Sequence, residues 1–106
     1  MRIALMGTKP RQRPEKLGRK LLQIRHALGL SQSEILRRLG VEGLVTTARI
    51  SEYEWGVREP SLSMLLAYAS AARIHLEYII DDDALLPDKL PGTFDYKRSQ
   101  RKATRS

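Results

Sequence analysis

The sequence predicts an all-α fold, a bundle of about five short helices. Apolar residues recur every three or four positions through the middle of the chain, which is the spacing that lines one face of a helix. Capping residues, glycines and prolines interrupt this pattern where helices would begin and end. No run alternates apolar and polar residues for long enough to favour a sheet. Since the chain has 106 residues, of which 42% are hydrophobic, we expect one domain with a small core.

The first two helices have the clearest limits. The first is predicted over residues 15–28, with Gly29 as its stop. Its apolar residues share one face: Leu17, Leu21, Ile24 and Leu28. Ser31 followed by Glu34 is the signature of a capping box, so a second helix begins there and ends at Gly40.

Three further helices are predicted. The third follows the linking segment VEGLV, with Thr46 or Thr47 as its N-cap. Its inward face comprises Ile50, Tyr53, Glu54 and Val57. Pro60 and Ser61 begin a fourth helix. The apolar stripe of the fourth helix comprises Leu62, Leu65, Leu66 and Ala69. A short fifth helix over residues 75–80 ends at a run of three aspartates.

The net charge of +7 is concentrated at the two ends of the chain. Residues 1–25 hold eight bases and one acid, and residues 97–106 hold five bases and no acid. Residues 26–96 hold six bases and eleven acids. A basic protein is a candidate for binding a polyanion, and here that binding would depend on the first helix and the chain ends. The alternative is that the basic ends only aid solubility.

Composition divides the chain into three parts. Residues 1–14, with glycine and prolines among charges, are predicted to form a flexible basic arm. Residues 15–86 are predicted to form the helical domain. Residues 87–106 are predicted to form a flexible basic tail, since they show no periodicity and offer little apolar surface to pack.

Several kinds of site have no support in the sequence. It has no cysteine, which excludes disulfides, cysteine-ligated zinc and a thiol nucleophile. His26 and His75 lack the paired spacing of a zinc site, so we expect no enzymatic activity, no metal and no cofactor. No stretch approaches the ~20 apolar residues of a membrane span, and the first residues lack the apolar region of a signal peptide. We therefore expect a soluble, cytoplasmic protein with no membrane partner.

Two stretches carry a more specific signal. LLQIRHALGLSQSEILRRLG, followed by ISEYEWGVREPSL, resembles the Cro and phage-repressor (xenobiotic-response-element) family of helix-turn-helix DNA-binding domains. The resemblance covers roughly residues 16–81 and depends on GLSQ, on the LG that closes the second helix and on IS..E.G..EPS. It implies a five-helix lambda-repressor-like bundle and a sequence-specific double-stranded DNA-binding transcriptional regulator. It further implies a repressor that binds as a homodimer and places its third helix in the major groove.

The resemblance also implies which residues read bases. Thr47, Ala48 and Glu52 match the family's base-contacting positions, and Arg49 and Ser51 lie next to them. The chemistry is suitable, because arginine pairs with guanine, a carboxylate can accept from the cytosine amino group, and small methyl groups can pack on thymine.

Phosphate contacts are expected from five residues. Gln32 matches the family's glutamine at the N-terminus of the second helix, where backbone N–H groups attract anions. Arg58 matches a basic loop position that touches the phosphate backbone. Lys16, Arg19 and Lys20 on the first helix are further candidates because of their charge.

Glu54 is expected to have a structural role. It falls on the inward face of the third helix, where an unpaired carboxylate is costly. Arg25 lies on the inward side of the first helix and likewise needs a partner. Because the matching residues pair across these helices in the family, the resemblance implies an ion pair between Arg25 and Glu54.

The sequence departs from the family pattern in the link before the third helix. Nine residues separate Gly40 from Ile50, whereas a tight connection has a turn of about 3–4 residues. VEGLV therefore looks like an insertion, in which Leu44 and Val45 either pack locally or project toward DNA. Trp55 stands where the family often has a polar or basic residue, and packing against the loop is favoured over stacking on a sugar or base.

Two partner assignments stay open. Four apolar residues near the end of the domain are candidates for a dimer surface or for closing the core: Tyr78, Ile79, Leu85 and Leu86. The alternative function is an antitoxin-type protein that binds a protein partner as well as DNA, with the basic segment from Lys97 ordering on that partner. RNA binding has less support, since only six aromatic residues are available for stacking.

Overall fold

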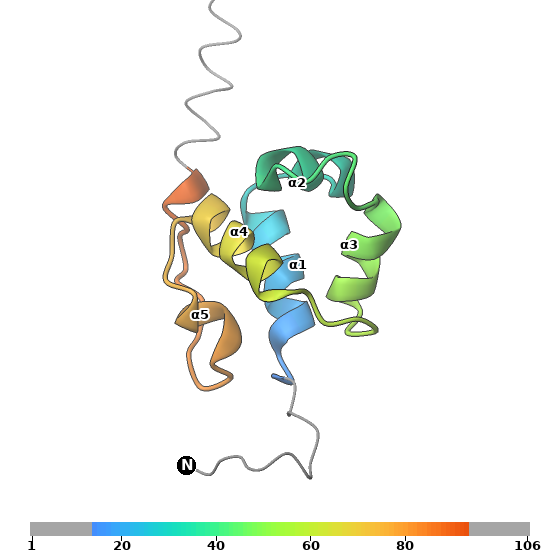
Figure 1. Ribbon diagram of the computed structural model, residues 1–106. Helices are drawn as coiled ribbons and strands as arrows, with labels where there is room; N and C mark the ends of the chain where they lie inside the picture. The colour runs from blue at the N-terminus through green and yellow to red at the C-terminus, as the bar shows by residue number, and fades with distance from the viewer. Residues whose placement is uncertain (1–13, 94–106) are drawn as a thin grey trace, which may run out of the picture.

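The computed structural model describes residues 14–93, and within this range the chain forms five α-helices and no strand (Figure 1). They are α1 (Leu17–Ala27), α2 (Gln32–Leu39), α3 (Thr47–Glu54), α4 (Leu62–Ala72) and α5 (Glu77–Ile80). The predicted all-α bundle is therefore confirmed. None of these helices is long and apolar enough to cross a membrane. Most of both predicted basic ends, residues 1–13 and 94–106, lies outside the described residues.

Helix α1 is the centre of the bundle. It packs against α3, α4 and α5, and α2 packs against α3 and α4. Figure 1 shows α3 on one side of α1 and α5 on the other. Each helix contributes at least one fully buried side chain to a continuous core: Leu21, Ile35, Ile50, Tyr68 and Ile79. The core therefore fixes α3 against the rest of the domain.

The limits of α2 and α4 follow from local hydrogen bonds that the sequence predicts. The Ser31 hydroxyl accepts from the backbone N–H of Glu34 at 3.1 Å, and the Glu34 carboxylate accepts from the Ser31 N–H at 2.8 Å. This capping box is worth about 1 kcal/mol of helix stability. Gly40 ends α2 with a φ of 75°, which favours glycine. At the start of α4 the Ser61 hydroxyl accepts from the Met64 N–H.

The end of α3 differs from the prediction. The helix stops at Glu54, and Gly56 adopts a φ of 77° that turns the chain away from the helical path. Val57 therefore does not continue the inward face and is exposed. Its assignment to the core was wrong, because the helical spacing was extended through a residue that breaks it.

The apolar stripe of α4 is rotated from the predicted one. Leu65 and Ala69 are buried, but Leu62 and Leu66 are exposed. The buried face consists of Met64, Leu65, Tyr68, Ala69 and Ala72. Helical spacing from Leu65 fits this face as well as spacing from Leu62 fits the predicted one, so periodicity alone did not fix which face is inward.

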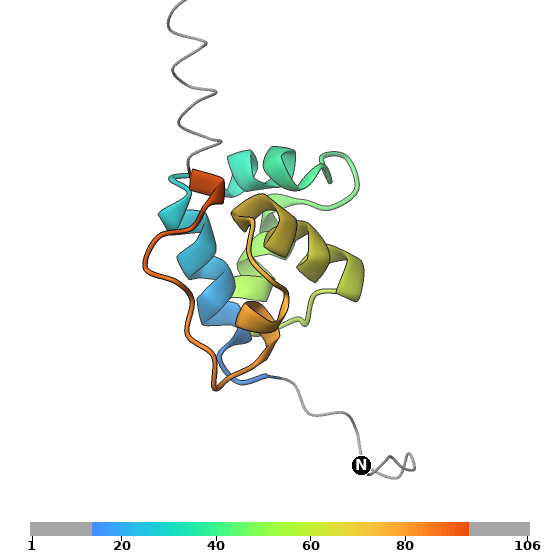
Figure 2. The same cartoon turned by 90° about the vertical axis from the view of Figure 1, so that its left-hand side faces the viewer.

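The packed domain extends beyond residue 86, which was its predicted end. Leu90 is only 2% exposed and belongs to the core, although it lies in the predicted basic tail. A Cβ atom added at Gly92 would lie 2.0 Å from the Ala71 carbonyl oxygen, so this segment touches α4. Figure 2 shows the segment after α5, in orange, running alongside α1. A single leucine among prolines and charges has no periodicity that would reveal this packing.

The four apolar residues near the end of the domain fall into two groups. Ile79 is fully buried and Leu86 packs against the core, so these two close the monomer. Leu85 is exposed and Tyr78 is half-buried. A dimer surface made from all four is therefore excluded by the folding of the single chain.

Candidate nucleic-acid interface

The outward face of α3 carries all five predicted base-reading residues. Ile50 and Tyr53 are buried on the opposite face and hold α3 to the core. The outward residues are exposed or half-buried: Thr47, Ala48, Arg49, Ser51 and Glu52. Because α3 begins at Thr47, with Thr46 as its N-cap, these residues occupy its first two turns. Their side chains are therefore presented together along the outward face of the helix.

A buried ion pair joins α1 to the C-terminal end of α3. The Arg25 guanidinium donates from Nε to Glu54 Oε2 at 2.7 Å and from Nη2 to Oε1 at 3.0 Å. The side chains are 12% and 6% exposed, respectively. Arg25 also donates from Nη1 to the Leu30 carbonyl, and its hydrogen bonds with Glu54 raise its pKa. The structure thus brings together the two residues that the resemblance pairs.

Gln32 connects this ion pair to the start of α2. Its side-chain amide donates to Glu54 Oε1 at 3.3 Å, and the residue is half-buried. The amide is therefore placed by the same carboxylate that binds Arg25. A role for Gln32 at a phosphate stays a prediction, and this hydrogen bond orients the side chain that would make the contact.

Gly18 allows α1 and α3 to approach closely at the same end of α3. A Cβ atom added there would lie 2.7 Å from the Tyr53 carbonyl oxygen and 2.8 Å from that of Glu54. Real Cβ atoms do not approach backbone oxygens so closely, so the helices would have to separate. The only signal of this close approach in the sequence is an isolated glycine inside a helical pattern, from which it was not predicted.

Gly18→Ala should lower the free energy of unfolding by about 1–3 kcal/mol, because overpacking exceeds the gain in helix propensity. Urea unfolding followed by circular dichroism measures this difference. Gln23→Ala, at an exposed position of the same helix, is the matched control and should change stability by less than about 0.5 kcal/mol. Equal or higher stability of Gly18→Ala would show that the close approach is not required.

Lys20 is the one predicted phosphate contact that the structure removes from the surface. Its side chain is 4% exposed, and Nζ donates at 2.7 Å to each of three carbonyl oxygens, those of Tyr78, Asp81 and Ala84. Burial lowers the pKa of this ammonium, while Asp82 and Asp81 oppose that shift. The prediction of a phosphate contact is therefore wrong. Lys20 lies one position before Leu21 on the inward side of α1, and its long side chain can bury its stem and charge together when carbonyls surround it.

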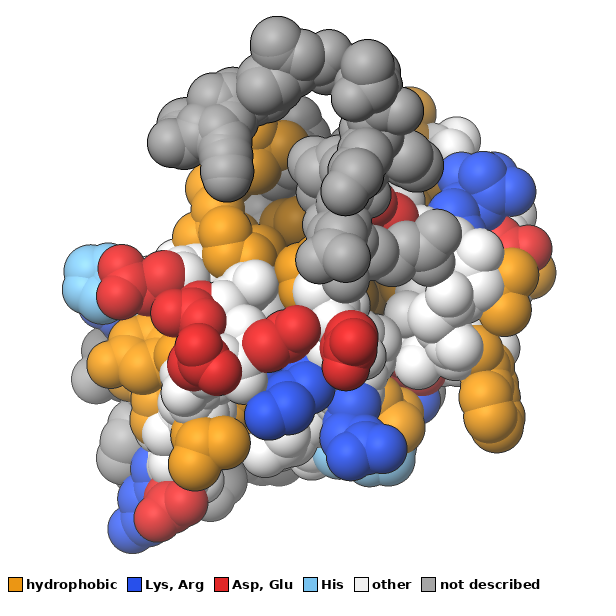
Figure 3. Space-filling view, turned by 90° about the horizontal axis from the view of Figure 1, so that it is seen from below, with side chains coloured by type: hydrophobic (Ala, Val, Ile, Leu, Met, Phe, Trp, Pro, Cys, Tyr) orange, Lys and Arg blue, Asp and Glu red, His pale blue; other side chains and the backbone are white. Residues whose placement is uncertain are grey.

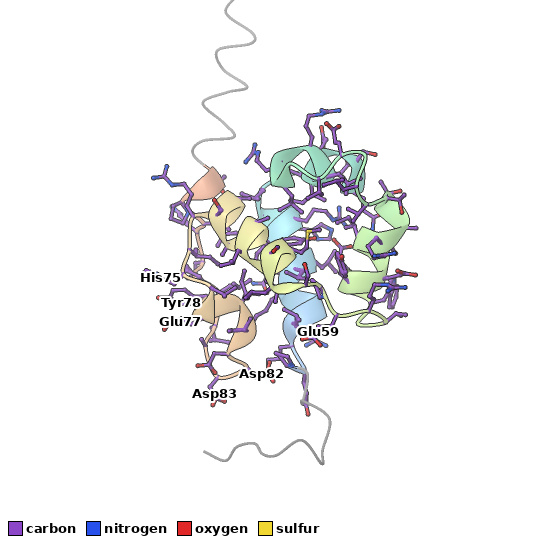
Figure 4. The ribbon with its side chains drawn as sticks, viewed as in Figure 1. Glu59, His75, Glu77, Tyr78, Asp82 and Asp83 are labelled. Carbon is purple, nitrogen blue, oxygen red and sulfur yellow. The ribbon has the colours of Figure 1, made fainter. Side chains whose placement is uncertain are left out.

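The other basic residues of α1 have different surroundings. Lys16 is exposed, and its Nζ donates to the Asp82 carbonyl at 3.1 Å. The Asp82 carboxylate accepts from the backbone N–H groups of Glu15 and Lys16, and these bonds lower its pKa. Figure 4 shows Asp82 beside the start of α1. Arg19, in contrast, is exposed beside α3.

A surface groove of about 510 Å³ lies between α1, the start of α2 and the end of α3. Arg19, Gln32 and Trp55 all line it, together with Leu22. Trp55 is 81% exposed, so the favoured interpretation, packing against the loop, is wrong. The turn at Gly56 directs the chain away before any side chain covers the indole. The groove therefore combines a cation, an amide and an exposed aromatic ring next to α3, with the carboxylate of Glu15 also in its lining.

Three side chains on and after α3 form a charged cluster, which we call the Glu52 cluster: Arg49, Glu52 and Arg58. Glu52 Oε1 lies 3.3 Å from Arg49 Nε and 3.0 Å from Arg58 Nε. The backbone N–H groups of Val57 and Arg58 both donate to the Glu52 carbonyl oxygen. The cluster was not predicted from the sequence, because it forms only once the chain folds back after Gly56.

The link between α2 and α3 separates the two apolar residues of VEGLV. Val45 packs against the core, as does Val41, whereas Leu44 is exposed. Glu42 and Val45 form an isolated bridge, and Arg37 Nε donates to Glu42 Oε2 at 3.2 Å. The link is therefore a folded turn whose apolar tip points into solvent.

One group of acidic side chains lies on the opposite side of α1 from α3. Helix α5 and the turn after it carry Glu77, Asp81, Asp82 and Asp83. Figure 3 shows acidic side chains gathered on the face seen from below. A polyanion is repelled by such a face.

Comparison with known proteins gives one match. A family model described as helix-turn-helix matches residues 21–79, which is more than half of the chain and runs from α1 into α5. Searches of curated proteins and of solved structures found no match. The matched region contains the capped α2, the link and α3, in the order that the motif requires. The chain belongs to the Cro/C1-type helix-turn-helix family and is a DNA-binding regulator.

Proposed function

We propose that this protein is a repressor that binds a specific double-stranded DNA sequence as a homodimer, with α3 in the major groove. The observation that carries the proposal is the outward face of α3. That face offers polar and methyl groups over the first two turns, while Ile50, Tyr53 and the Arg25–Glu54 pair fix the opposite side. Base reading requires both conditions, because side chains must be held accurately against base edges.

The outward residues have complementary chemistry for base edges. Arg49 can donate to guanine, and Thr47 and Ser51 can bond to several bases. The methyl groups of Thr47 and Ala48 can pack against the thymine methyl. Glu52 is the acidic member of this face.

Phosphate contacts are proposed for four residues: Gln32, Arg19, Arg58 and Lys16. Gln32 and Arg19 line the groove beside α3, which supports contact with the strand that borders the major groove. Arg58 is exposed just after α3. Lys16 is the weakest member of the set because it already bonds to Asp82.

The proposed homodimer uses the exposed apolar side chains of α4 and α5. Leu62, Leu66 and Ile80 are exposed, and Leu62 and Ile80 line one groove. A second copy on this surface would bury them, and the homodimer would have to hold its two α3 helices over half-sites ~34–36 Å apart. The alternative antitoxin-type function has no further support here, since its proposed partner segment from Lys97 lies outside the described residues.

Selection of bound sequences from random duplex DNA tests this proposal. We expect enrichment of a two-fold symmetric site with half-sites about 10–10.5 base pairs apart. Tight binding to DNA with no enriched sequence would contradict sequence-specific reading. Enrichment of a single half-site would contradict the dimer but not the role of α3.

Two arginine variants separate base reading from phosphate binding. Arg49→Ala should cost about 1–3 kcal/mol on the selected site and relax the preference at one base pair. Arg19→Ala should weaken binding to all sequences equally and reduce the salt slope by about 1. Fluorescence anisotropy with the selected duplex and its single-base variants measures both. Uniform weakening by Arg49→Ala would place this residue at the phosphate backbone instead.

A further inference from the structure

The Glu52 cluster places one carboxylate between two arginines on the proposed DNA-facing side. Arg49 lies one turn before Glu52 on α3, and Arg58 lies beyond the turn at Gly56. One carboxylate oxygen, Glu52 Oε1, is within 3.3 Å of both Nε atoms. The acid therefore joins a residue of the helix to a residue of the following loop.

The backbone fixes the geometry of this cluster. The Glu52 carbonyl oxygen accepts from the N–H of Val57 at 2.9 Å and from the N–H of Arg58 at 3.3 Å. These backbone hydrogen bonds therefore fix the position of the Arg58 Cα and Cβ atoms relative to Glu52, independently of the contact between the side chains. The carboxylate then restricts the rotamers of both long arginine side chains.

Stability does not explain the cluster. All three side chains are about half exposed, and ion pairs at such positions contribute little to folding, because solvent screens them. Two features point to binding instead. An Nε contact uses one of the five N–H donors of a guanidinium, so the Nη groups keep the chemistry needed for a base or a phosphate. The carboxylate also reduces the charge of the cluster from +2 to +1.

We propose that Glu52 is a positioning residue that holds Arg49 for base reading and Arg58 for phosphate contact, and that it limits binding to unrelated DNA. This inference rests on the proposed entry of α3 into the major groove. Orienting the arginines in advance reduces the entropy that ordering them on DNA would cost. Neutralising part of their charge weakens the sequence-independent attraction to phosphates. Both effects favour the correct site over unrelated DNA.

This role differs from direct reading of cytosine by Glu52. A base-reading carboxylate accepts from the cytosine amino group and determines the preference at one base pair. A positioning carboxylate acts through Arg49 and Arg58, so its removal changes the binding of every sequence. The two roles therefore predict different results for the same variant.

Glu52→Gln tests the proposal, because it keeps the side-chain shape and one carbonyl acceptor but removes the charge. We expect tighter binding to an unrelated duplex, and a salt slope that is steeper by about one to two as the arginines engage phosphates. The ratio of specific to non-specific affinity should fall on the order of tenfold. Fluorescence anisotropy with the selected and the unrelated duplex, across a series of NaCl concentrations, gives all three quantities.

Glu77→Gln is the matched control, since it changes the net charge equally on α5, across α1 from α3. It should leave the salt slope unchanged. The effect of Glu52→Gln should also disappear in an Arg49→Ala/Arg58→Ala background, which is the signature of coupling between these residues. Thermal unfolding of every variant checks that the fold is retained.

Two results would overturn the inference and leave the proposed function intact. One is a loss of preference at a single base pair with an unchanged salt slope, which would make Glu52 a base reader. The other is equal behaviour of Glu52→Gln and Glu77→Gln. If the unaltered protein selects no sequence at all, the proposed function fails first, and the specificity role of Glu52 fails with it.

Discussion

Arg25→Met should lower the free energy of unfolding by about 3–5 kcal/mol, which is the largest effect expected of any substitution considered for this protein. The variant leaves the Glu54 carboxylate, only 6% exposed, with the Gln32 amide as its remaining partner among the hydrogen bonds described above. An uncompensated buried charge is costly because the surroundings solvate it poorly. Urea unfolding at neutral pH, followed by circular dichroism, measures the loss.

The chain offers a matched control for this experiment. Arg37 and Glu42 form an ion pair of the same type at 3.2 Å, but both side chains are exposed. Arg37→Met should therefore cost less than about 1 kcal/mol. The double variant Arg25→Met/Glu54→Met should lose less than the sum of its single variants, because it leaves no unpaired charge. Equal small losses from Arg25→Met and Arg37→Met would contradict a structural role for the buried pair.

Lys20→Met should lower the free energy of unfolding by about 2–4 kcal/mol, because three charge-assisted hydrogen bonds are lost. Of their acceptors, the Asp81 carbonyl oxygen keeps the backbone N–H of Ala84 as a donor. Methionine keeps most of the buried stem, so the loss reports mainly on the ammonium. The same unfolding measurement applies. Amide hydrogen exchange should show that residues 77–84 lose protection first, since they contain the three acceptors.

Lys16→Met is the control for Lys20. Its ammonium is exposed and bonds to one carbonyl oxygen, that of Asp82. This variant should change stability by less than about 1 kcal/mol. DNA binding gives an independent check, because Lys20→Met should leave the salt slope unchanged at a temperature where it is folded. A smaller salt slope of DNA binding for Lys20→Met would show that Lys20 contacts a phosphate.

The parts of the fold that the sequence predicted are those encoded locally. Ser31 and Glu34 lie three residues apart, and their capping box depends on nothing distant. Gly40 ends α2 for a similarly local reason. The Arg25–Glu54 pair spans two helices and was accessible only through the family resemblance, on residues that match it.

The predictions that were wrong depend on how the chain turns or on which face of a helix is buried. Val57 was predicted to face inward by continuing the helical spacing through Gly56, whose left-handed conformation ends the helix. Trp55 was predicted to pack against the loop, but the loop leaves it exposed. The Glu52 cluster arises from that same reversal and so had no signal in the spacing. The burial of the Lys20 ammonium depends on carbonyl oxygens some sixty residues away, whose positions cannot be predicted from composition. The burial of Leu90 could be predicted only by knowing the path of the segment after α5.

The exposure of Trp55 gives the protein an intrinsic optical probe. It is the single tryptophan of the chain, so the indole emission comes from one position. That position borders the groove that also contains Arg19 and Gln32. Indole emission depends on contact with water, and a strand of DNA seated in the groove would displace that water. Titration with DNA, followed by the fluorescence of Trp55, therefore reports binding of DNA at this edge of α3 without an added dye. The signal comes from this one residue and not from the complex as a whole.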